Sequence, residues 1–297
     1  MRGTVIVLAL ALLVACGSAA SSDAPARIPI GARGGVLVPA FGSLWTTDLT
    51  LNRLVRIDPQ AARVTGKRVL GYSPYGLTTG AGSVWVASQN GDRLARVNPQ
   101  TLKVVRQVPV GFRAFAAAFG AGSVWVSLES DGTVARVSPK RNRVVKRIRG
   151  FSDPNGLVYA NGAIWVSDLA RGRVSRIDPR TNRVTNRIAV PAADWITPGG
   201  GALWVSSERG RVFRLDPVSR KVVGSVAVGA NPLASAWVDG ALWVPNIDAN
   251  TISVVDPATN TVSRTIQAGN APLGIAATAA GVFVSMSNDG SVWRFSR

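Results

Sequence analysis

The sequence predicts an all-β fold, a seven-bladed β-propeller with four antiparallel strands in each blade. One observation is a tryptophan that recurs every 39 or 40 residues, with phenylalanine in the seventh position. These residues are Trp45, Trp85, Trp125, Trp165, Trp204, Trp243 and Phe283. A second is a glycine three residues before six of the seven. A third is a turn signal ending in proline downstream of six of them. A constant period near 40 residues indicates a repeat fold.

Each repeat reads as four short strands, named a to d in chain order. In the fourth repeat, residues 156–159 form strand a, and Gly162 makes the a–b hairpin before the strand that carries Trp165. Residues 173–177 alternate between apolar and polar side chains, as a half-exposed strand does. Asp178 and Pro179 then predict a c–d turn, and residues 183–190 form strand d. No segment keeps a helical apolar period over three turns.

The two chain ends predict how the ring closes. The last repeat stops after strand c, at residues 293–297, and lacks a strand d. Residues 27–31 precede the first repeat and resemble the strand d endings elsewhere, such as residues 107–111. We therefore expect the N-terminal strand to complete the last blade, which removes the open edges of a linear array.

Residues 1–26 predict an export signal rather than part of the fold. Arg2 precedes an apolar stretch over residues 5–15, too short to span a bilayer, and the only cysteine, Cys16, follows Ala15. This resembles the lipobox of bacterial lipoproteins, in which the cysteine is diacylated. The alternative is an ordinary secretory peptide. We expect a signal peptide over residues 1–15, a tether over 16–26 and the propeller over 27–297. The protein is then exported and lipid-anchored on the outer face of the bacterial cell membrane.

The repeat itself resembles a known family. Residues 162–168 and 172–182 are similar to the repeats of YVTN/NHL-like propellers, and more narrowly to the streptogramin (virginiamycin B) lyase-like branch. The resemblance covers the chain from Arg27 onward and implies the propeller fold. Those lyases use a histidine as acid or base, with a glutamate and magnesium. This chain has no histidine, so the resemblance does not carry that mechanism over.

The histidine and cysteine counts exclude several kinds of site. Without histidine there is no Ser-His-Asp or Cys-His catalysis and no histidine-based zinc site, and one cysteine forms no internal disulfide. We therefore lean toward a protein that is not an enzyme and has no cofactor. The alternative is a metal-dependent enzyme, streptogramin lyase-like or lactonase-like, at the central channel. Asn155, Asp168 and Glu208 are oxygen donors of the kind that Ca²⁺ takes, and Mg²⁺ is also considered.

Function is expected where the blades differ, because the repeated residues serve the fold. The d–a and b–c connections share the face that carries the channel mouth, where aromatic and polar side chains form a plausible ligand site. The candidate ligand-binding residues are Tyr75, Arg113, Phe115, Asn155, Asp168, Trp195, Glu208 and Asn231. The same face also carries Glu129, Asp153 and Asp194, which stay outside this candidate set.

The chain has 34 Lys and Arg against 16 Asp and Glu, a formal net charge of +18. The densest basic run is a candidate polyanion patch. Its members are Lys140, Arg141, Arg143, Lys146, Arg147 and Arg149. Such a patch attracts anionic polymers through forces that salt weakens. The alternative is that basic residues protect exposed strand edges from pairing with other chains.

We expect a monomeric, non-catalytic, cell-surface binding scaffold, attached to the membrane through its lipid anchor. Its ligand is expected to be an envelope protein, an anionic or other envelope polymer, or a small molecule at the mouth. Nucleic acid is not the expected partner, because the basic residues lack a ladder of stacking aromatic side chains.

Overall fold

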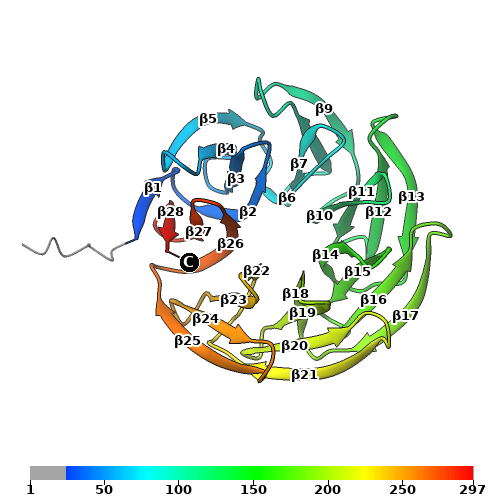
Figure 1. The fold of residues 1–297 in the computed structure, drawn as a ribbon. Coiled ribbons are helices and arrows are strands. Elements are labelled where there is room, and N and C mark those ends of the chain that lie inside the picture. Colours follow the sequence, from blue (N-terminus) through cyan, green and yellow to red (C-terminus); the bar gives the residue numbers. More distant parts are fainter. Residues whose placement is uncertain (1–24, 297) are drawn as a thin grey trace, which may run out of the picture.

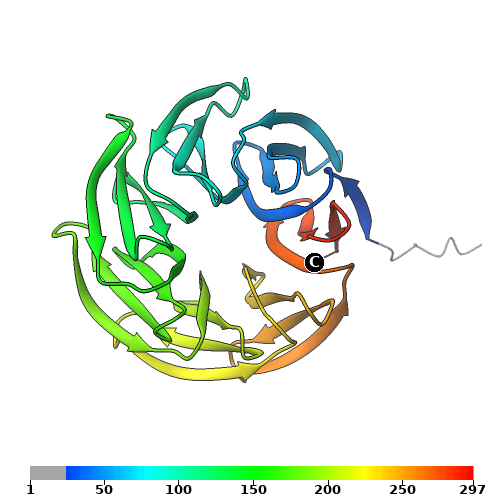
Figure 2. The same ribbon diagram turned by 180° about the vertical axis from the view of Figure 1, so that it is seen from behind.

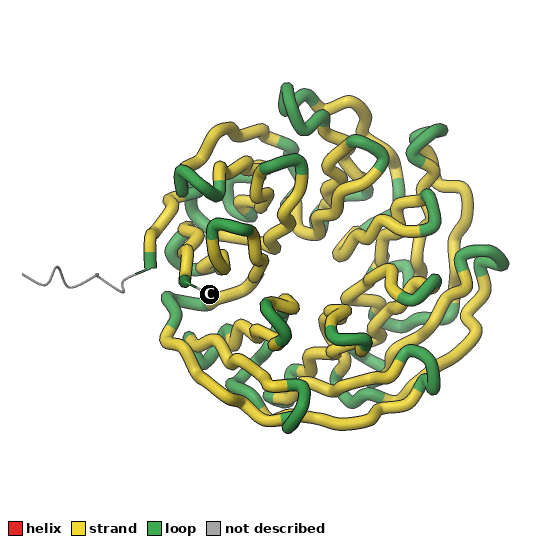
Figure 3. Tube along the Cα trace, in the orientation of Figure 1, coloured by secondary structure: helices red, strands yellow, loops and turns green. Residues whose placement is uncertain are grey.

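The computed structural model describes residues 25–296 and confirms the predicted all-β, seven-bladed propeller. Its 28 strands form seven sheets of four antiparallel strands around a central axis (Figures 1 and 3). Within the described residues, no helix is long and apolar enough to cross a membrane. Cys16, the predicted signal peptide and nearly all of the predicted tether lie outside the described residues.

The seven blades follow one another along the chain, each with its strand a innermost. Blade 1 holds β2 (Gly34–Ala40), β3 (Ser43–Asp48), β4 (Arg53–Asp58) and β5 (Arg63–Val69). Blade 2 holds β6 (Pro74–Gly80), β7 (Ser83–Ser88), β8 (Arg93–Val97) and β9 (Val104–Pro109). Blade 3 holds β10 (Ala114–Gly120), β11 (Ser123–Leu128), β12 (Thr133–Ser138) and β13 (Arg143–Arg149). Blade 4 holds β14 (Pro154–Ala160), β15 (Ala163–Asp168), β16 (Arg173–Asp178) and β17 (Arg183–Ala189).

Blades 5 to 7 keep the same order. Blade 5 holds β18 (Ala193–Gly199), β19 (Ala202–Ser207), β20 (Arg211–Asp216) and β21 (Lys221–Ala227). Blade 6 holds β22 (Ala236–Val238), β23 (Ala241–Asn246), β24 (Thr251–Asp256) and β25 (Thr261–Gln267). Blade 7 holds β26 (Pro272–Thr278), β27 (Gly281–Met286), β28 (Ser291–Phe295) and, from the other end of the chain, β1 (Ala26–Pro29).

The predicted closure between the chain ends is confirmed. Strand β1 pairs antiparallel with β28, with Ile28 opposite Val292, and lies at the outside of blade 7 in both views of the ring (Figures 1 and 2). The Ile28 side chain is 1% exposed, and its cluster joins blade 7 to blade 1 through Leu37 and Phe283. Pairing with β1 therefore covers the outer edge of β28, which would otherwise be open.

The repeated residues have the structural roles that the sequence predicts. Gly162 takes φ of 70° after Asn161 at 49°, which fits the mirror-image turn of a two-residue hairpin. Asp178 Oδ1 accepts the backbone N–H of Arg180 at 2.8 Å and closes the c–d turn. Trp125 is fully buried and packs against apolar side chains of the next blade, including Ile164. The repeated tryptophans are thus the contacts between neighbouring blades.

Candidate ligand-binding site at the propeller mouth

Three positions of each repeat meet at one end of the channel, and all three have fixed offsets from the tryptophan position. In blade 3 they are Arg113 in the d–a loop, Phe115 near the start of strand a, and Glu129 just after strand b. The N–H of the b–c residue donates to the carbonyl oxygen of the d–a residue, as Glu129 does to Arg113 at 3.2 Å. The same bond recurs in all seven blades, so the backbone of the mouth is repeated while its side chains vary.

A bulge aims the strand-a residue at the mouth. In six blades the pairing of strands a and b shifts after the first residue of strand a, for example between Pro154 and Leu157 in blade 4. A bulge of this kind turns a side chain away from the regular alternation. The strand-a positions, in blade order, are Gly35, Tyr75, Phe115, Asn155, Asp194, Leu233 and Leu273.

Five of these residues, those of blades 2 to 6, line a cavity of about 290 Å³ that is open to solvent. Its lining residues are Tyr75, Arg113, Phe115, Glu129, Asp153, Asn155, Leu169, Asp194, Glu208, Asn231 and Leu233. Beyond it lies a channel of about 280 Å³, lined by strands a of six blades and by Ala234 and Ser235, which precede β22 in blade 6. The mouth is therefore asymmetric and carries charged side chains, whereas no charged side chain of the described residues lines the channel.

Three aromatic side chains from different blades stand where the mouth meets the channel. The rings of Tyr75 and Phe115 are stacked with centroids 4.5 Å apart, and Trp195 meets Phe115 edge-on at 6.4 Å. Trp195 lines the channel rather than the mouth cavity, and it packs against the clusters of blades 1–2 and 3–4. The aromatic group thus gives the mouth an apolar floor.

Four carboxyl groups line the same cavity, although the chain as a whole is strongly basic. Glu129 is paired with Arg113, whose Nη2 lies 2.7 Å from its Oε2. Burial, together with the negative charges of Glu208, Asp153 and Glu129, raises the pKa of the Asp194 carboxyl to about 7. Burial also raises the pKa of Glu129 and of Asp153, against the opposing effect of the Arg113 charge. Among the residues that line this cavity, one guanidinium therefore stands with four carboxyl groups, while the Arg33 charge acts on Tyr75 from blade 1.

Two buried oxygens in this cavity have no hydrogen-bond partner. They are Oδ1 of Asp194 and Oδ1 of Asn155, and each of these residues is 6% exposed. Both backbones are fixed by the preceding blade: Ser127 Oγ donates to the Asn155 carbonyl at 2.8 Å, and Ser167 Oγ donates to the Asp194 carbonyl. The two acceptors are therefore held by the fold while their hydrogen bonds are left unmade, which costs free energy.

One predicted site residue, Asp168, does not face the cavity. Its side chain is fully buried, pairs with Arg173 at 3.2 Å and accepts the N–H groups of Ser152 and Asp153. Including Asp168 among the ligand-binding candidates was wrong, because its buried carboxylate holds the d–a loop through the N–H groups of Ser152 and Asp153.

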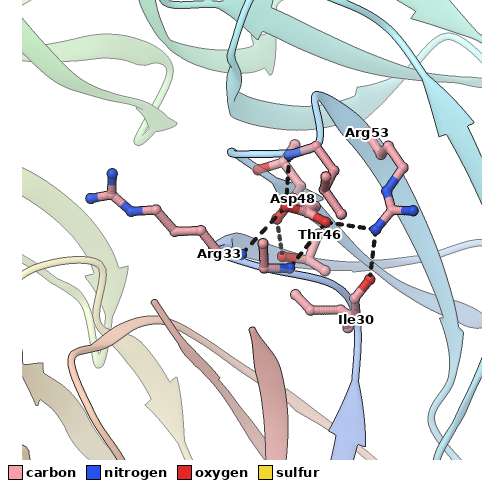
Figure 4. A network of polar contacts seen from close by, with 8 residues as sticks. Ile30, Arg33, Thr46, Asp48 and Arg53 are labelled. Atoms are coloured by element: carbon pink, nitrogen blue, oxygen red, sulfur yellow. Dashed lines mark hydrogen bonds and ion pairs between the residues drawn. The ribbon is translucent and has the colours of Figure 1, made fainter. Parts of the chain in front are cut away.

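Asp48 has the same structural role in blade 1, where it holds the d–a loop in place. Its carboxylate pairs with Arg53 at 2.8 Å, while Arg53 also reaches the Ile30 carbonyl (Figure 4). Its oxygens also accept the backbone N–H groups of Ala32 and Arg33 in the d–a loop (Figure 4). Burial alone would raise the pKa of Asp48, but the hydrogen bonds from the Arg53 side chain and from three backbone N–H groups together lower it below its ordinary value.

The structure places the remaining predicted candidates as follows. Tyr75, Arg113, Phe115, Asn155, Glu208 and Asn231 line the mouth cavity. The candidate set lacked Glu129, Asp153 and Asp194, which line it too. Their offsets from Trp125, Trp165 and Trp204 are the signal that finds them, because residues at equal offsets lie at equal places in the ring. Among the described residues, no group of three or more Asp, Glu or Cys side chains is arranged to hold a metal ion.

The predicted polyanion patch is spread over the outer wall of blade 3. Lys140 and Arg141 lie in the c–d turn, and the others lie on β13. Arg147 and Arg149 line a groove of about 460 Å³ together with Arg183 and Arg187 of blade 4. Four guanidinium-bearing residues from two neighbouring blades therefore share one groove.

Comparison with known proteins supports the fold alone. A solved structure described as that of a streptogramin B lyase matches with a TM-score of 0.81 and 15% sequence identity, covering 91% of this chain and 97% of that chain. In all, 1624 chains of solved structures match, so the fold does not single out an activity. No family model matches the chain, and no curated protein matches it in sequence. The predicted lyase-like propeller fold is confirmed.

Proposed function

We propose that this protein is a non-catalytic binding scaffold that takes a small ligand at the mouth of the propeller. The observation that carries the proposal is the contrast within the repeat. The backbone of the mouth is the same in every blade, whereas the side chains on it differ and enclose one asymmetric cavity. Function that resides on variable loops of a rigid framework is the usual arrangement for binding sites.

A non-catalytic role is supported by the residue types in the chain. The lyase chemistry that the resemblance would imply needs a histidine, and this chain has none. The cavity offers carboxyl groups, amides and aromatic rings, which suit recognition of a ligand. The alternative, a metal-dependent enzyme, requires the carboxyl groups of the cavity to bind a metal ion.

The proposal includes the cellular location of the protein. The apolar stretch over residues 5–15 and Cys16 after it support export and lipid anchoring on the outer face of the bacterial cell membrane. Labelling cells with a radioactive fatty acid tests this: label should enter the wild-type chain and not the Cys16→Ser variant. Equal label in both would leave an ordinary secreted protein.

Thermal melting of the full chain in detergent tests the binding role. A ligand that binds only the folded state raises the Tm. The screen should include small molecules and envelope fragments, with Phe115→Ala to remove the floor of the cavity and Val105→Ala, on the outer wall, as control. Recovery of the bound compound with unchanged mass supports a scaffold. A Tm rise with Ca²⁺ or Mg²⁺ that EDTA reverses and Glu208→Gln abolishes would favour the enzyme instead.

The groove shared by Arg147, Arg149, Arg183 and Arg187 favours a second candidate function, attachment to an anionic envelope polymer. Clustered guanidinium groups attract polyanions in a salt-dependent way. Reversal of Lys146, Arg147 and Arg149 to Glu should abolish retention on a polyanion column at low salt. Unchanged retention would assign these residues to protection of the outer strand.

A further inference from the structure

The mouth cavity has a charge opposite to that of the protein around it. Four of the 16 acidic residues of the chain line this one cavity, and the salt bridge from Arg113 reaches only Glu129. Asp153, Asp194 and Glu208 thus face the cavity without an ion-pair partner among the described residues. An anionic ligand would be repelled here, whereas a cation would be drawn in.

The unpartnered oxygens indicate a second property of the ligand besides its charge, namely that it carries hydrogen-bond donors. Oδ1 of Asp194 and Oδ1 of Asn155 are buried acceptors at equivalent positions of blades 5 and 4, where Ser167 and Ser127 donate to the backbone carbonyls of the same two residues. Buried acceptors of this kind are satisfied by a donor N–H or O–H group. A cation that carries N–H groups supplies both the positive charge and the hydrogen-bond donors. A quaternary ammonium supplies only the charge.

The floor of the cavity adds an apolar requirement. Tyr75 and Phe115 line the cavity together with the carboxyl groups, and Trp195 meets Phe115 edge-on from the channel side. Aromatic faces attract ammonium groups and pack against apolar ligand surface. A metal ion would make no use of this floor, and the described residues hold no metal-binding group of acidic side chains.

We propose that the mouth cavity binds a protonated organic amine, with its ammonium N–H groups directed to Asp194 and Asn155 and its apolar part against the aromatic floor. This inference rests on the proposed binding function and names the chemical class of its ligand. Glu208 and Asp153 supply further negative charge at the rim.

Binding should depend on pH in a direction that the geometry defines. The groups facing Asp194 are Glu208 on its own blade, Asp153 and Glu129 on the preceding two blades, and Tyr75 on blade 2, while Arg113 lines the same cavity. A bound ammonium favours the ionised form of Asp194. Affinity should therefore rise between pH 6 and pH 8, by at most about tenfold per pH unit for one coupled proton.

The test is calorimetric titration of the full chain with 2-phenylethylammonium at pH 8. Two probes of similar shape serve as comparisons, the neutral 2-phenylethanol and the N-trimethylated cation, which has no N–H group. We expect the ammonium to bind at least about tenfold more tightly than either, since it alone makes charge-assisted hydrogen bonds. Equal binding of the alcohol would overturn the inference. So would the absence of ammonium binding at about 10 mM, a concentration at which even a weak site is occupied.

Two variants locate the binding and separate this inference from the broader proposal. Asp194→Asn should weaken ammonium binding at least about tenfold, whereas Asp248→Asn, an exposed acid on the same face, should not change it. No effect of Asp194→Asn would overturn the inference. If a neutral or anionic compound binds instead, and Phe115→Ala abolishes that binding, the scaffold function stands and the amine is wrong.

Discussion

The guanidinium carbon of Arg136 lies 4.9 Å from the centroid of the Trp125 ring, directly opposite it on the neighbouring strand. From there, Nη1 of Arg136 donates to the carbonyl of Pro179 at 2.7 Å, in the c–d turn of the next blade. Arg56, Arg96 and Arg214 make the equivalent bond to the proline carbonyl of the following blade. The repeated tryptophan, arginine and Asp-Pro turn are therefore parts of one latch between blades.

Removal of this latch should destabilise the ring. Arg136 also donates to Asn182 Oδ1 and Ser123 Oγ, both at 2.9 Å. Loss of these bonds and of the cation–π contact in Arg136→Ala should lower the free energy of unfolding by about 2 kcal/mol. Urea unfolding measures this. Arg141→Ala, in an exposed turn, should change stability by less than about 0.5 kcal/mol. Equal effects of the two would refute the latch.

Closure of the ring should depend on the side chain of Ile28. It fills the interface between β1 and blade 1 and is 1% exposed, so Ile28→Ala should cost about 2–4 kcal/mol. Val69, on the corresponding outer strand of blade 1, is 67% exposed, and Val69→Ala should be nearly neutral. Chemical unfolding compares the two. A neutral Ile28→Ala would mean that β1 adds nothing to the stability of the ring.

The fold could be predicted because every blade repeats the same few contacts. Trp125, Gly122 and Pro139 recur at fixed offsets, and their roles follow from residue type alone. The excess of arginine was harder to interpret. The sequence suggested edge protection or a polyanion patch, whereas Arg136 and its equivalents serve the contacts between blades. The role of Arg136 depends on its pairing with Trp125 on the neighbouring strand and on its bond to the next blade. Neither contact is visible in the sequence of a single repeat.

The sequence placed the candidate residues on the face where the cavity lies, but it did not find all of the residues that line that cavity. Asp168 and Leu169 are neighbours in sequence, yet Asp168 is buried beneath the loop and Leu169 lines the cavity. One residue of offset from the tryptophan thus separates a structural side chain at the end of β15 from a lining side chain in the turn that follows it. The acidic character of the mouth was hidden as well, because Asp153 and Asp194 contribute little to a net charge of +18.

Asp168 should behave as a structural residue in solution. Asp168→Ala leaves the Arg173 guanidinium without its buried partner and frees two backbone N–H groups, at a cost of about 3 kcal/mol. The loss should be the same in EDTA and in millimolar Ca²⁺. Asp178→Ala, in an exposed c–d turn, should cost about 1 kcal/mol. A Ca²⁺-dependent Tm in the wild type that Asp168→Ala abolishes would restore Asp168 to a metal site.

Asp194 should make the protein less stable as the pH rises. Its pKa is about 7 in the folded chain, against an ordinary value of 3.8, so the unfolded state binds fewer protons between these values. The free energy of unfolding therefore falls from about pH 4 to pH 7, and the penalty is complete above pH 7. Asp194→Asn removes it and should raise stability at pH 8, by at most about 4 kcal/mol, with little change at pH 4. Urea unfolding at pH 4, 6 and 8 measures the difference. A variant that is less stable at pH 8, or equally altered at every pH, would show that the carboxylate serves the fold rather than the cavity.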